Sequence, residues 1–229
     1  MAETLTSLID YTRKRADMEG TAFVTDDEIT HYLNDEIKAM YSKMVNIEEG
    51  ILFATVAPTL TKVGDNAYAL PSDFMRLVDV NVYTGSQWVP ASPADPQEYY
   101  QLLDDTYTGD YDTRFFLHRN NTLDRYELFV FPVGSASNLG VRYIPNMPTL
   151  SLGNETLNWP SNWHQVPVLG AAIKCVIKEE SDPSALMIEQ ESEIRRVLKD
   201  VRAQKIATVK TLRHIGPTNR RRFRLNRNF

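Results

Sequence analysis

The last 29 residues of this sequence contain no aspartate or glutamate, although the whole chain of 229 residues has a net charge of −5. Residues 201–229 hold nine lysines and arginines, whereas residues 1–200 hold sixteen basic and thirty acidic side chains. The chain therefore joins an acidic body with a charge of −14 to a basic segment with a charge of +9. Such segregation of charge indicates that the basic segment has a partner or a surface to find.

Cysteine is almost absent, and long apolar runs are absent. The one cysteine, Cys175, lies in the apolar run AAIKCVIK. A single cysteine excludes intramolecular disulfides and thiolate metal clusters. We interpret it as a buried helical thiol rather than a nucleophile. No run of eighteen apolar residues exists, and the first twenty residues lack the basic start and apolar centre of a signal peptide. We therefore expect a soluble protein that stays in the compartment where it is made.

The signatures of the common enzyme classes are also missing. The four histidines (His31, His118, His164 and His214) are dispersed, without the spacing of a zinc site. The sequence has no phosphate-binding loop, no dinucleotide-binding glycine motif and no nucleophile elbow. We therefore expect a protein that is not an enzyme and has no cofactor and no metal.

Two clusters have an alternative functional interpretation. Four acids between residues 104 and 114 (Asp104, Asp105, Asp110 and Asp112) could form a cation site, but they lack the calcium-loop spacing, so we expect a solvated loop. Trp159 and Trp163 could line a carbohydrate site, but their spacing beside Pro160 favours packing over the start of a helix.

Four segments have the apolar spacing of amphipathic helices. They cover residues 4–17, 25–44, 166–180 and 182 to about 209. Thr25 and Glu28 form a capping box at the start of the second helix. A further short helix is expected to begin at Asp95 and to include Leu103.

The middle of the chain has a different pattern. Short runs rich in β-branched and aromatic residues alternate with glycine, proline, asparagine and aspartate: ILFATVA, LVDVNVY, QWV, RFFLH, RYELFVF and LGVRYI. The sequence thus predicts an α+β fold. Residues 1–50 and 158–209 form an antiparallel helical bundle, residues 51–157 form a central antiparallel β-rich insertion, and residues 210–229 form an extended basic tail, because Gly216-Pro217 ends any helix.

One stretch carries a resemblance to a known family. Residues 68–80 read YALPSDFMRLVDV, and the Leu-Pro-x-Asp-Phe phrase within them resembles one common in the head-to-tail adaptor proteins of tailed bacteriophages, including the tail tubular A proteins. The order around the phrase is similar too: Asn46–Gly50 leads into the first strand, and the apolar helix at Ala171–Lys178 precedes an acidic helix with arginines at Ile188–Arg202.

The phrase also has a physical meaning that is independent of the family. We expect Pro71 to end a strand, Asp73 to cap a tight turn and Phe74 to fill the core. Together with Leu70 and Arg76, these residues are interpreted as a structural motif.

The resemblance implies a structural protein without catalytic residues. It implies a ring, usually of twelve copies, that joins the portal protein to the tail nozzle or tail tube protein, with tail fibres as a further candidate partner, and that continues the DNA channel. The implied location is the head-tail junction of the virion, after assembly in the host cytoplasm, with no membrane. The acidic body suits such a channel, because a negative lumen repels passing DNA and lets it slide without specific binding.

The basic segment is interpreted as the portal-binding element of such an adaptor. Its side chains alternate charge with apolar bulk, which suits docking into a groove: Arg220, Arg221, Arg222, Phe223, Arg224, Leu225, Arg227 and Phe229. A first alternative is a nucleic-acid-binding protein that uses the seven lysines and arginines between Lys210 and Arg227 as an arm. A distant alternative is a virion-associated hydrolase that uses Asp104, Asp105 or Glu98.

Overall fold

The computed structural model describes residues 3–18, 23–47, 54–57, 60–64, 66–83, 85–95, 98, 113–131, 139–160 and 162–213. Within these residues it contains four helices and eleven strands, which confirms the α+β class. The helices are α1 (Leu5–Arg15), α2 (Asp26–Ile47), α4 (Gln165–Lys178) and α5 (Ser184–Arg213). The strands are β1 (Glu3–Thr4), β2 (Thr55–Val56), β3 (Thr61–Lys62), β4 (Ala67–Ala69), β5 (Phe74–Tyr83), β6 (Trp88–Pro90), β7 (Ser92–Pro93), β8 (Arg114–Asn120), β9 (Arg125–Phe131), β10 (Leu139–Pro145) and β11 (Thr156–Leu157).

The start of α2 confirms the capping box expected from the sequence. The backbone N–H of Glu28 donates to the Thr25 hydroxyl (3.2 Å), and the N–H of Thr25 donates to the Glu28 carboxylate (3.0 Å). These reciprocal bonds satisfy two of the backbone donors that a helix start leaves without a partner. Helix α1 begins in a similar way, because the Thr4 side chain accepts a hydrogen bond from the N–H of Ser7.

Helix α4 ends in a tight turn that returns the chain as α5. The N–H of Ser181 donates to the Val176 carbonyl and the N–H of Glu180 donates to the Ile177 carbonyl, the pattern of a Schellman motif. The two helices are antiparallel, since Arg196 of α5 donates to the carbonyl of Asn162 just before α4 begins. Helix α5 has 30 residues and is therefore about 45 Å long. It ends at Arg213, so the first residues of the expected extended tail are helical.

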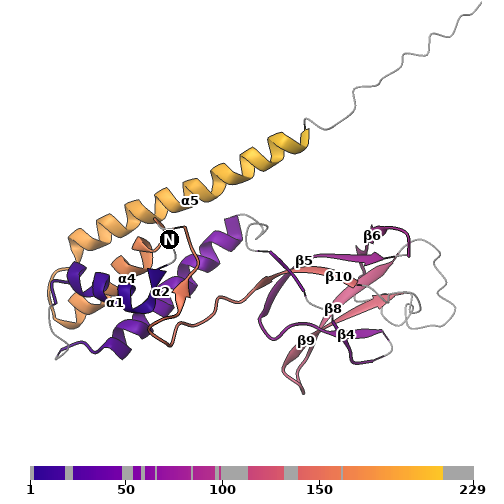
Figure 1. Ribbon diagram of the computed structural model, residues 1–229, viewed down its shortest axis with the longest axis horizontal. Helices are drawn as coiled ribbons and strands as arrows, with labels where there is room; N and C mark the ends of the chain where they lie inside the picture. Colours follow the sequence, from indigo (N-terminus) through magenta and orange to yellow (C-terminus); the bar gives the residue numbers. More distant parts are fainter. Residues whose placement is uncertain are drawn as a thin grey trace, which may run out of the picture.

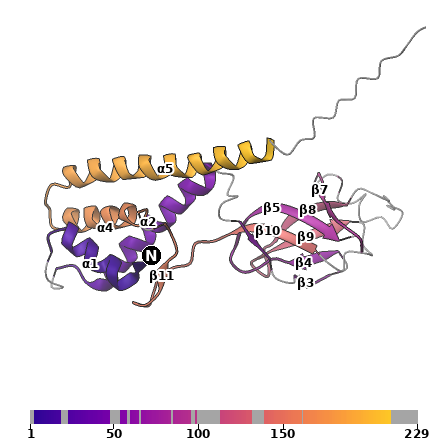
Figure 2. The ribbon, with the colours of Figure 1, turned by 45° about the horizontal axis from the view of Figure 1, so that its top comes forward.

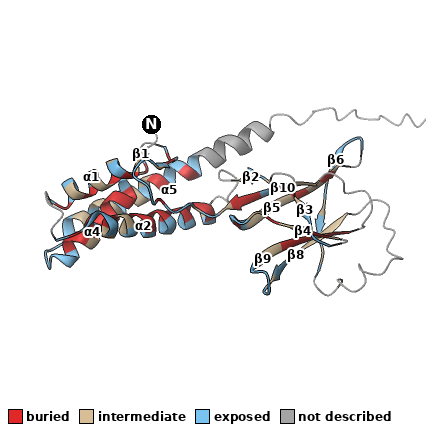
Figure 3. Ribbon diagram, turned by 60° about the horizontal axis from the view of Figure 1, so that its bottom comes forward, coloured by how far each residue is buried: buried red, intermediate tan, exposed pale blue. Residues whose placement is uncertain are grey.

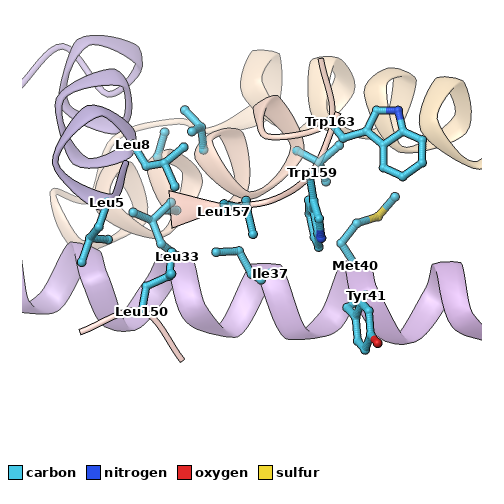
Figure 4. Close-up of a cluster of buried hydrophobic side chains, with 14 of the residues drawn as sticks. Leu5, Leu8, Leu33, Ile37, Met40, Tyr41, Leu150, Leu157, Trp159 and Trp163 are labelled. Atoms are coloured by element: carbon cyan, nitrogen blue, oxygen red, sulfur yellow. The ribbon is translucent and has the colours of Figure 1, made fainter. Parts of the chain in front are cut away.

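All four helices contribute to one hydrophobic core (Figure 4). We call it the helical core; among the described residues it joins the apolar faces of the helices to the segment that connects β10 with α4. Trp159 and Trp163 are both buried in it beside Met40, which confirms that they pack rather than line an open site. Cys175 is fully buried there, and burial raises the pKa of its thiol.

The strands form three sheets. A two-stranded sheet pairs β1 with β11, a four-stranded sheet has the order β2-β10-β5-β6, and a five-stranded sheet has the order β3-β4-β9-β8-β7. All pairings among the described strands are antiparallel except one, because β7 runs parallel to β8. The expectation of a purely antiparallel sheet was therefore wrong at this edge, where Ser92 is paired with Arg114.

The two larger sheets share a second, smaller hydrophobic core, which we call the sheet core. It is made by alternate residues of β5, β9 and β10 that point inward, Phe74 and Tyr143 among them, together with Leu70. Figures 1 and 2 show the helices gathered at one end of the molecule and these two sheets at the other. Figure 3 shows that buried residues occur in both parts. The connection from β10 back to α4 runs between them.

Candidate functional site

The Leu-Pro-x-Asp-Phe motif lies where the sheets meet the helices, at the start of β5. The N–H of Phe74 donates to the Pro71 carbonyl (3.0 Å) and so closes a tight turn directly after β4. Leu70 and Phe74 are both buried in the sheet core. The ring of Phe74 packs against those of Tyr126 and Tyr143, with centroid distances of 5.1 and 5.9 Å. The motif therefore fixes the entry of β5 into the sheet core.

The carboxylate of Asp73 has a different role from the one that the sequence predicts. Instead of capping its own turn, it accepts a hydrogen bond from the Tyr143 hydroxyl of β10 (2.9 Å). The backbone carbonyl of Asp73 accepts a second bond from the N–H of Asn146 (2.5 Å). Asp73 thus ties the motif to the end of β10, where the chain leaves the sheets for the helices.

Helix α2 holds the same point from the other side. The Tyr41 hydroxyl donates to the Pro145 carbonyl (2.9 Å), and Ile144 is buried in the helical core. Burial, reinforced by the nearby negative charge of Asp73, raises the pKa of Tyr41 to about 12. Burial and the hydrogen bond to Asp73 raise the pKa of Tyr143 to about 12 as well. Both phenols are therefore neutral donors across the physiological pH range.

Asn34 continues this attachment along α2. Its side-chain amide donates to the carbonyls of Thr30 and Leu150 (both 2.9 Å), and its oxygen accepts from the N–H of Leu150 (2.8 Å). Asn34 is buried, so these bonds stand in place of water for both backbone groups of Leu150. We call the contacts of Asn34, Tyr41, Asp73 and Tyr143 the joint between the helices and the sheets.

A hollow of about 390 Å³ opens beside the joint. It is lined by Lys38, Tyr41, Ser42, Met75, Asn146, Met147 and Thr149. Arg76, the last residue of the expected motif, lies on β5 opposite Ile144 and is partly buried. Of the five motif residues, Asp73 forms part of the joint, Leu70 and Phe74 pack in the sheet core, and the Pro71 carbonyl accepts the hydrogen bond that closes the turn.

A second hollow, of about 430 Å³, lies between α1 and the first turns of α4. Its floor is apolar, formed by the buried Val168 and Leu169, and its lining includes Glu3 and Gln165. Lys14 and Arg15 line it as well, and Tyr11 and His164 do so with their rings stacked at 6.1 Å. The lining therefore holds two cations and one acid, Glu3. We call this feature the basic hollow.

The outer face of the four-stranded sheet is polar with an aromatic end. Arg142 of β10 forms an ion pair with Asp79 of the adjacent β5, and this pair raises the pKa of Arg142. Trp88 packs against Tyr83 at a centroid distance of 5.3 Å and lies close to Gly140, where a side-chain carbon would meet the indole at 3.0 Å. The Arg142–Asp79 pair thus neutralises its own charge on this face.

The portal-binding residues expected from the sequence, Arg220 to Phe229, lie outside the described residues, as do the acids between Asp104 and Asp112. Glu98 is described and forms an ion pair with Arg114 at 3.3 Å. In the described ranges, no three histidine, cysteine, aspartate or glutamate residues gather into a group that could hold a metal ion. No described helix is long and apolar enough to cross a membrane.

The sequence pattern missed the joint. Tyr41 lies in the apolar stripe of α2, which predicts only packing, and no sequence pattern marks Tyr143. A polar Asn34 directly beside the buried Leu33 of an amphipathic helix is the one signal that could have marked this attachment.

The sequence model of the SU10 adaptor protein family matches residues 3–220, nearly the whole chain. No curated protein matches the chain. The family match confirms the resemblance to phage head-to-tail adaptors that the Leu-Pro-x-Asp-Phe phrase indicates. Adaptors are structural proteins rather than a class of enzymes, and the family implies portal and tail components of the virion as partners.

Proposed function

The chain belongs to the SU10 adaptor protein family, and on this premise we propose that it is a structural head-to-tail adaptor whose copies form a ring of twelve between the portal and the tail of a phage. The family match over residues 3–220 is the observation that carries this proposal. In the ring, residues 1–50 and 158–209 act as a helical unit and residues 51–157 as a β-rich unit. The joint sets the angle between them.

The basic segment docks on the portal in this proposal. Helix α5 supports it, because its 30 residues run antiparallel to the 14 residues of α4 and continue past the first turn of α4 (Figures 1 and 2). The chain therefore continues beyond Arg213 at a point about 45 Å from the start of α5. In this proposal Arg220 to Phe229, which follow further along the chain, offer charge-assisted bonds and apolar contacts to an acidic groove.

The ring continues the DNA channel and faces the tail nozzle or tail tube protein on its other side, with tail fibres as a further candidate partner. The charge of −14 in residues 1–200 supports a lumen that repels DNA and lets it pass.

The test is co-sedimentation with purified portal rings of the same phage. Full-length protein, a truncation to residues 1–216 and a DNA duplex control are compared. We expect the full-length protein to sediment with the portal, the truncation to stay in the supernatant while remaining folded, and neither to bind DNA. Electron microscopy of the complex counts the copies in the ring. Unchanged portal affinity of the truncation would refute docking by the basic segment.

The seven lysines and arginines between Lys210 and Arg227 favour one second candidate, a nucleic-acid arm. Such an arm predicts DNA affinity that falls steeply with salt and disappears in the truncation to residues 1–216. The DNA control of the same experiment measures this directly.

A further inference from the structure

The turn between α4 and α5 carries acidic side chains, which are opposite in charge to Lys14 and Arg15 of the basic hollow. Its residues Glu179, Glu180 and Asp182 are exposed acids, and in the part of the chain that the structure describes neither Glu179 nor Glu180 has an ion-pair partner. Large apolar side chains beside the turn are also exposed: Ile177 (56%), Met187 (55%) and Ile188 (72%). We call these six residues the acidic knob. Exposed apolar groups of this size, rimmed by charge, are typical of an interaction surface.

The basic hollow has the complementary properties. Its floor of Val168 and Leu169 is apolar, its volume of about 430 Å³ exceeds that of a single aliphatic side chain, and its cations Lys14 and Arg15 have exposed fractions of 68% and 44%. Each cation has a partner in its own chain, Asp10 for Lys14 and Glu189 for Arg15. Exposed pairs of this kind contribute little to stability, so an incoming carboxylate can compete for the cations.

The acids Glu179 and Glu180 of the knob follow the last turn of α4, whereas the hollow is lined by residues of its first turns, about 15 Å away along the helix axis. Ile188 of the knob lies nearer to the hollow, because it directly precedes Glu189, whose carboxylate pairs with Arg15 at 3.1 Å. The acids of one copy therefore cannot reach its own hollow while α4 stays folded. A second copy, placed head to tail beside the first, can do so, and such heterologous contacts generate rings when the rotation closes.

Electrostatics adds a reason for this contact. Bodies with a charge of −14 repel one another, so a ring of them needs places where opposite charges meet. Residues 13–15 of α1 are three consecutive cations in residues 1–200, and two of them line the hollow.

We propose that the basic hollow of one copy receives the acidic knob of the next copy, with the apolar side chains of the knob on Val168 and Leu169 and with Glu179 and Glu180 near Lys14 and Arg15. This inference rests on the proposed ring, and it names the two surfaces that build it.

Charge reversal tests the contact with the full chain. The hollow variant carries Lys14→Glu and Arg15→Glu, the knob variant carries Glu179→Lys and Glu180→Lys, and a fourfold variant carries all of them. The control variant, Lys43→Glu with Lys199→Glu, changes the net charge as much as the hollow variant does, on exposed positions of α2 and α5. Ring assembly is measured by sedimentation velocity and electron microscopy, alone and on portal rings, and thermal melting shows that each variant is folded.

We expect the hollow variant and the knob variant each to lose at least about tenfold in assembly affinity, which corresponds to about 1.4 kcal/mol. Their equimolar mixture and the fourfold variant restore assembly, because every contact in those rings again joins opposite charges. The control variant assembles as the wild type does, and the fourfold variant fails to assemble with the wild type.

A second measurement does not depend on charge reversal. Single variants Lys14→Cys and Glu180→Cys are mixed on portal rings and oxidised, with Cys175 buried and out of reach. A disulfide between the two variants is expected, and the pair Lys43→Cys with Glu180→Cys gives none.

Several outcomes overturn the inference. Normal rings from the hollow variant, no rescue in the mixture, or no disulfide between the Lys14→Cys and Glu180→Cys variants would each show that the two surfaces do not meet. Normal rings that lose the portal would assign the hollow to a portal segment instead. If the wild type forms no ring even on the portal, the proposed function itself fails, and this result is distinct from all of the others.

Discussion

The helical core joins twenty-four buried residues of the described chain, whereas the sheet core joins eight. The difference also concerns range, because the helical core draws on both ends of the described sequence, from Leu5 to Val201. The last buried residue of β10, Ile144, belongs to the helical core and not to the sheet core. The helices therefore hold the segment that connects β10 with α4, and the two larger sheets are attached to the helices through this segment.

The comparison explains how an adaptor can hold one shape and still present different surfaces. A large core keeps the helices rigid, and rigid helices suit a ring whose copies must repeat the same contact. The core between the two sheets has fewer buried residues to hold them together. The joint decides whether the two parts move as one body.

The largest expected effect comes from cavities in the two cores. Leu33 and Leu128 are both fully buried, the first in the helical core and the second in the sheet core. Leu33→Ala and Leu128→Ala should each lower the free energy of unfolding by about 2–5 kcal/mol. Hydrogen exchange should show Leu33→Ala exposing all four helices, while Leu128→Ala exposes only the sheets. Equal loss of protection in both parts from Leu128→Ala would mean that the two cores unfold as one unit.

The next effect concerns the attachment of the connection to α2. Asn34→Ala leaves the buried N–H and C=O of Leu150 without their partners, which should cost about 1–3 kcal/mol. Denaturant unfolding measures this cost. The control Asn46→Ala, on an exposed position of the same helix, should change the free energy of unfolding little. A neutral Asn34→Ala would show that water replaces the amide and that the connection is not held there.

The helices were predictable from the sequence because their signals are local. The capping box at Thr25 and Glu28, the apolar stripe of α2 and the restart after Pro183 all lie within a few residues of the feature they predict. The strand runs were predictable for the same reason. The strand register and the contacts of the joint were not predictable, because the partners of Asp73 and Asn34 lie 70 and 116 residues away along the chain. No local pattern encodes such distances.

A smaller effect at the joint depends on pH. Tyr143→Phe and Tyr41→Phe each remove one hydrogen bond and should lower the free energy of unfolding by about 0.5–1.5 kcal/mol. In the folded state the pKa of each phenol is raised from 10.0 to about 12, so the fold favours the protonated form. The stability that depends on this protonation is complete below pH 10 and is lost as the pH rises toward 12.

Urea unfolding at about pH 8 and about pH 11 measures that loss. The wild type should lose more stability between these values than the double variant Tyr41→Phe/Tyr143→Phe does. Tyr11→Phe is the matched control, since Tyr11 is exposed and lies away from the joint. An equal loss in the wild type and in the double variant would show that other groups cause the alkaline instability.

The smallest effect on stability is at Glu180, and it should have the opposite sign. Glu180 follows α4 with a φ of 59°, in the left-handed region that favours glycine. Glu180→Gly should therefore raise the free energy of unfolding by about 0.5–1 kcal/mol, because relief of the strained backbone exceeds the entropy that glycine adds to the unfolded chain.

The same change removes an acid from the knob, so assembly should weaken while stability rises. Glu179→Gln is the matched control: it removes a neighbouring charge of the knob without changing the backbone, and should weaken assembly with unfolding unchanged. If Glu180→Gly gained stability and assembled as well as the wild type, this carboxylate would have no part in the contact between copies.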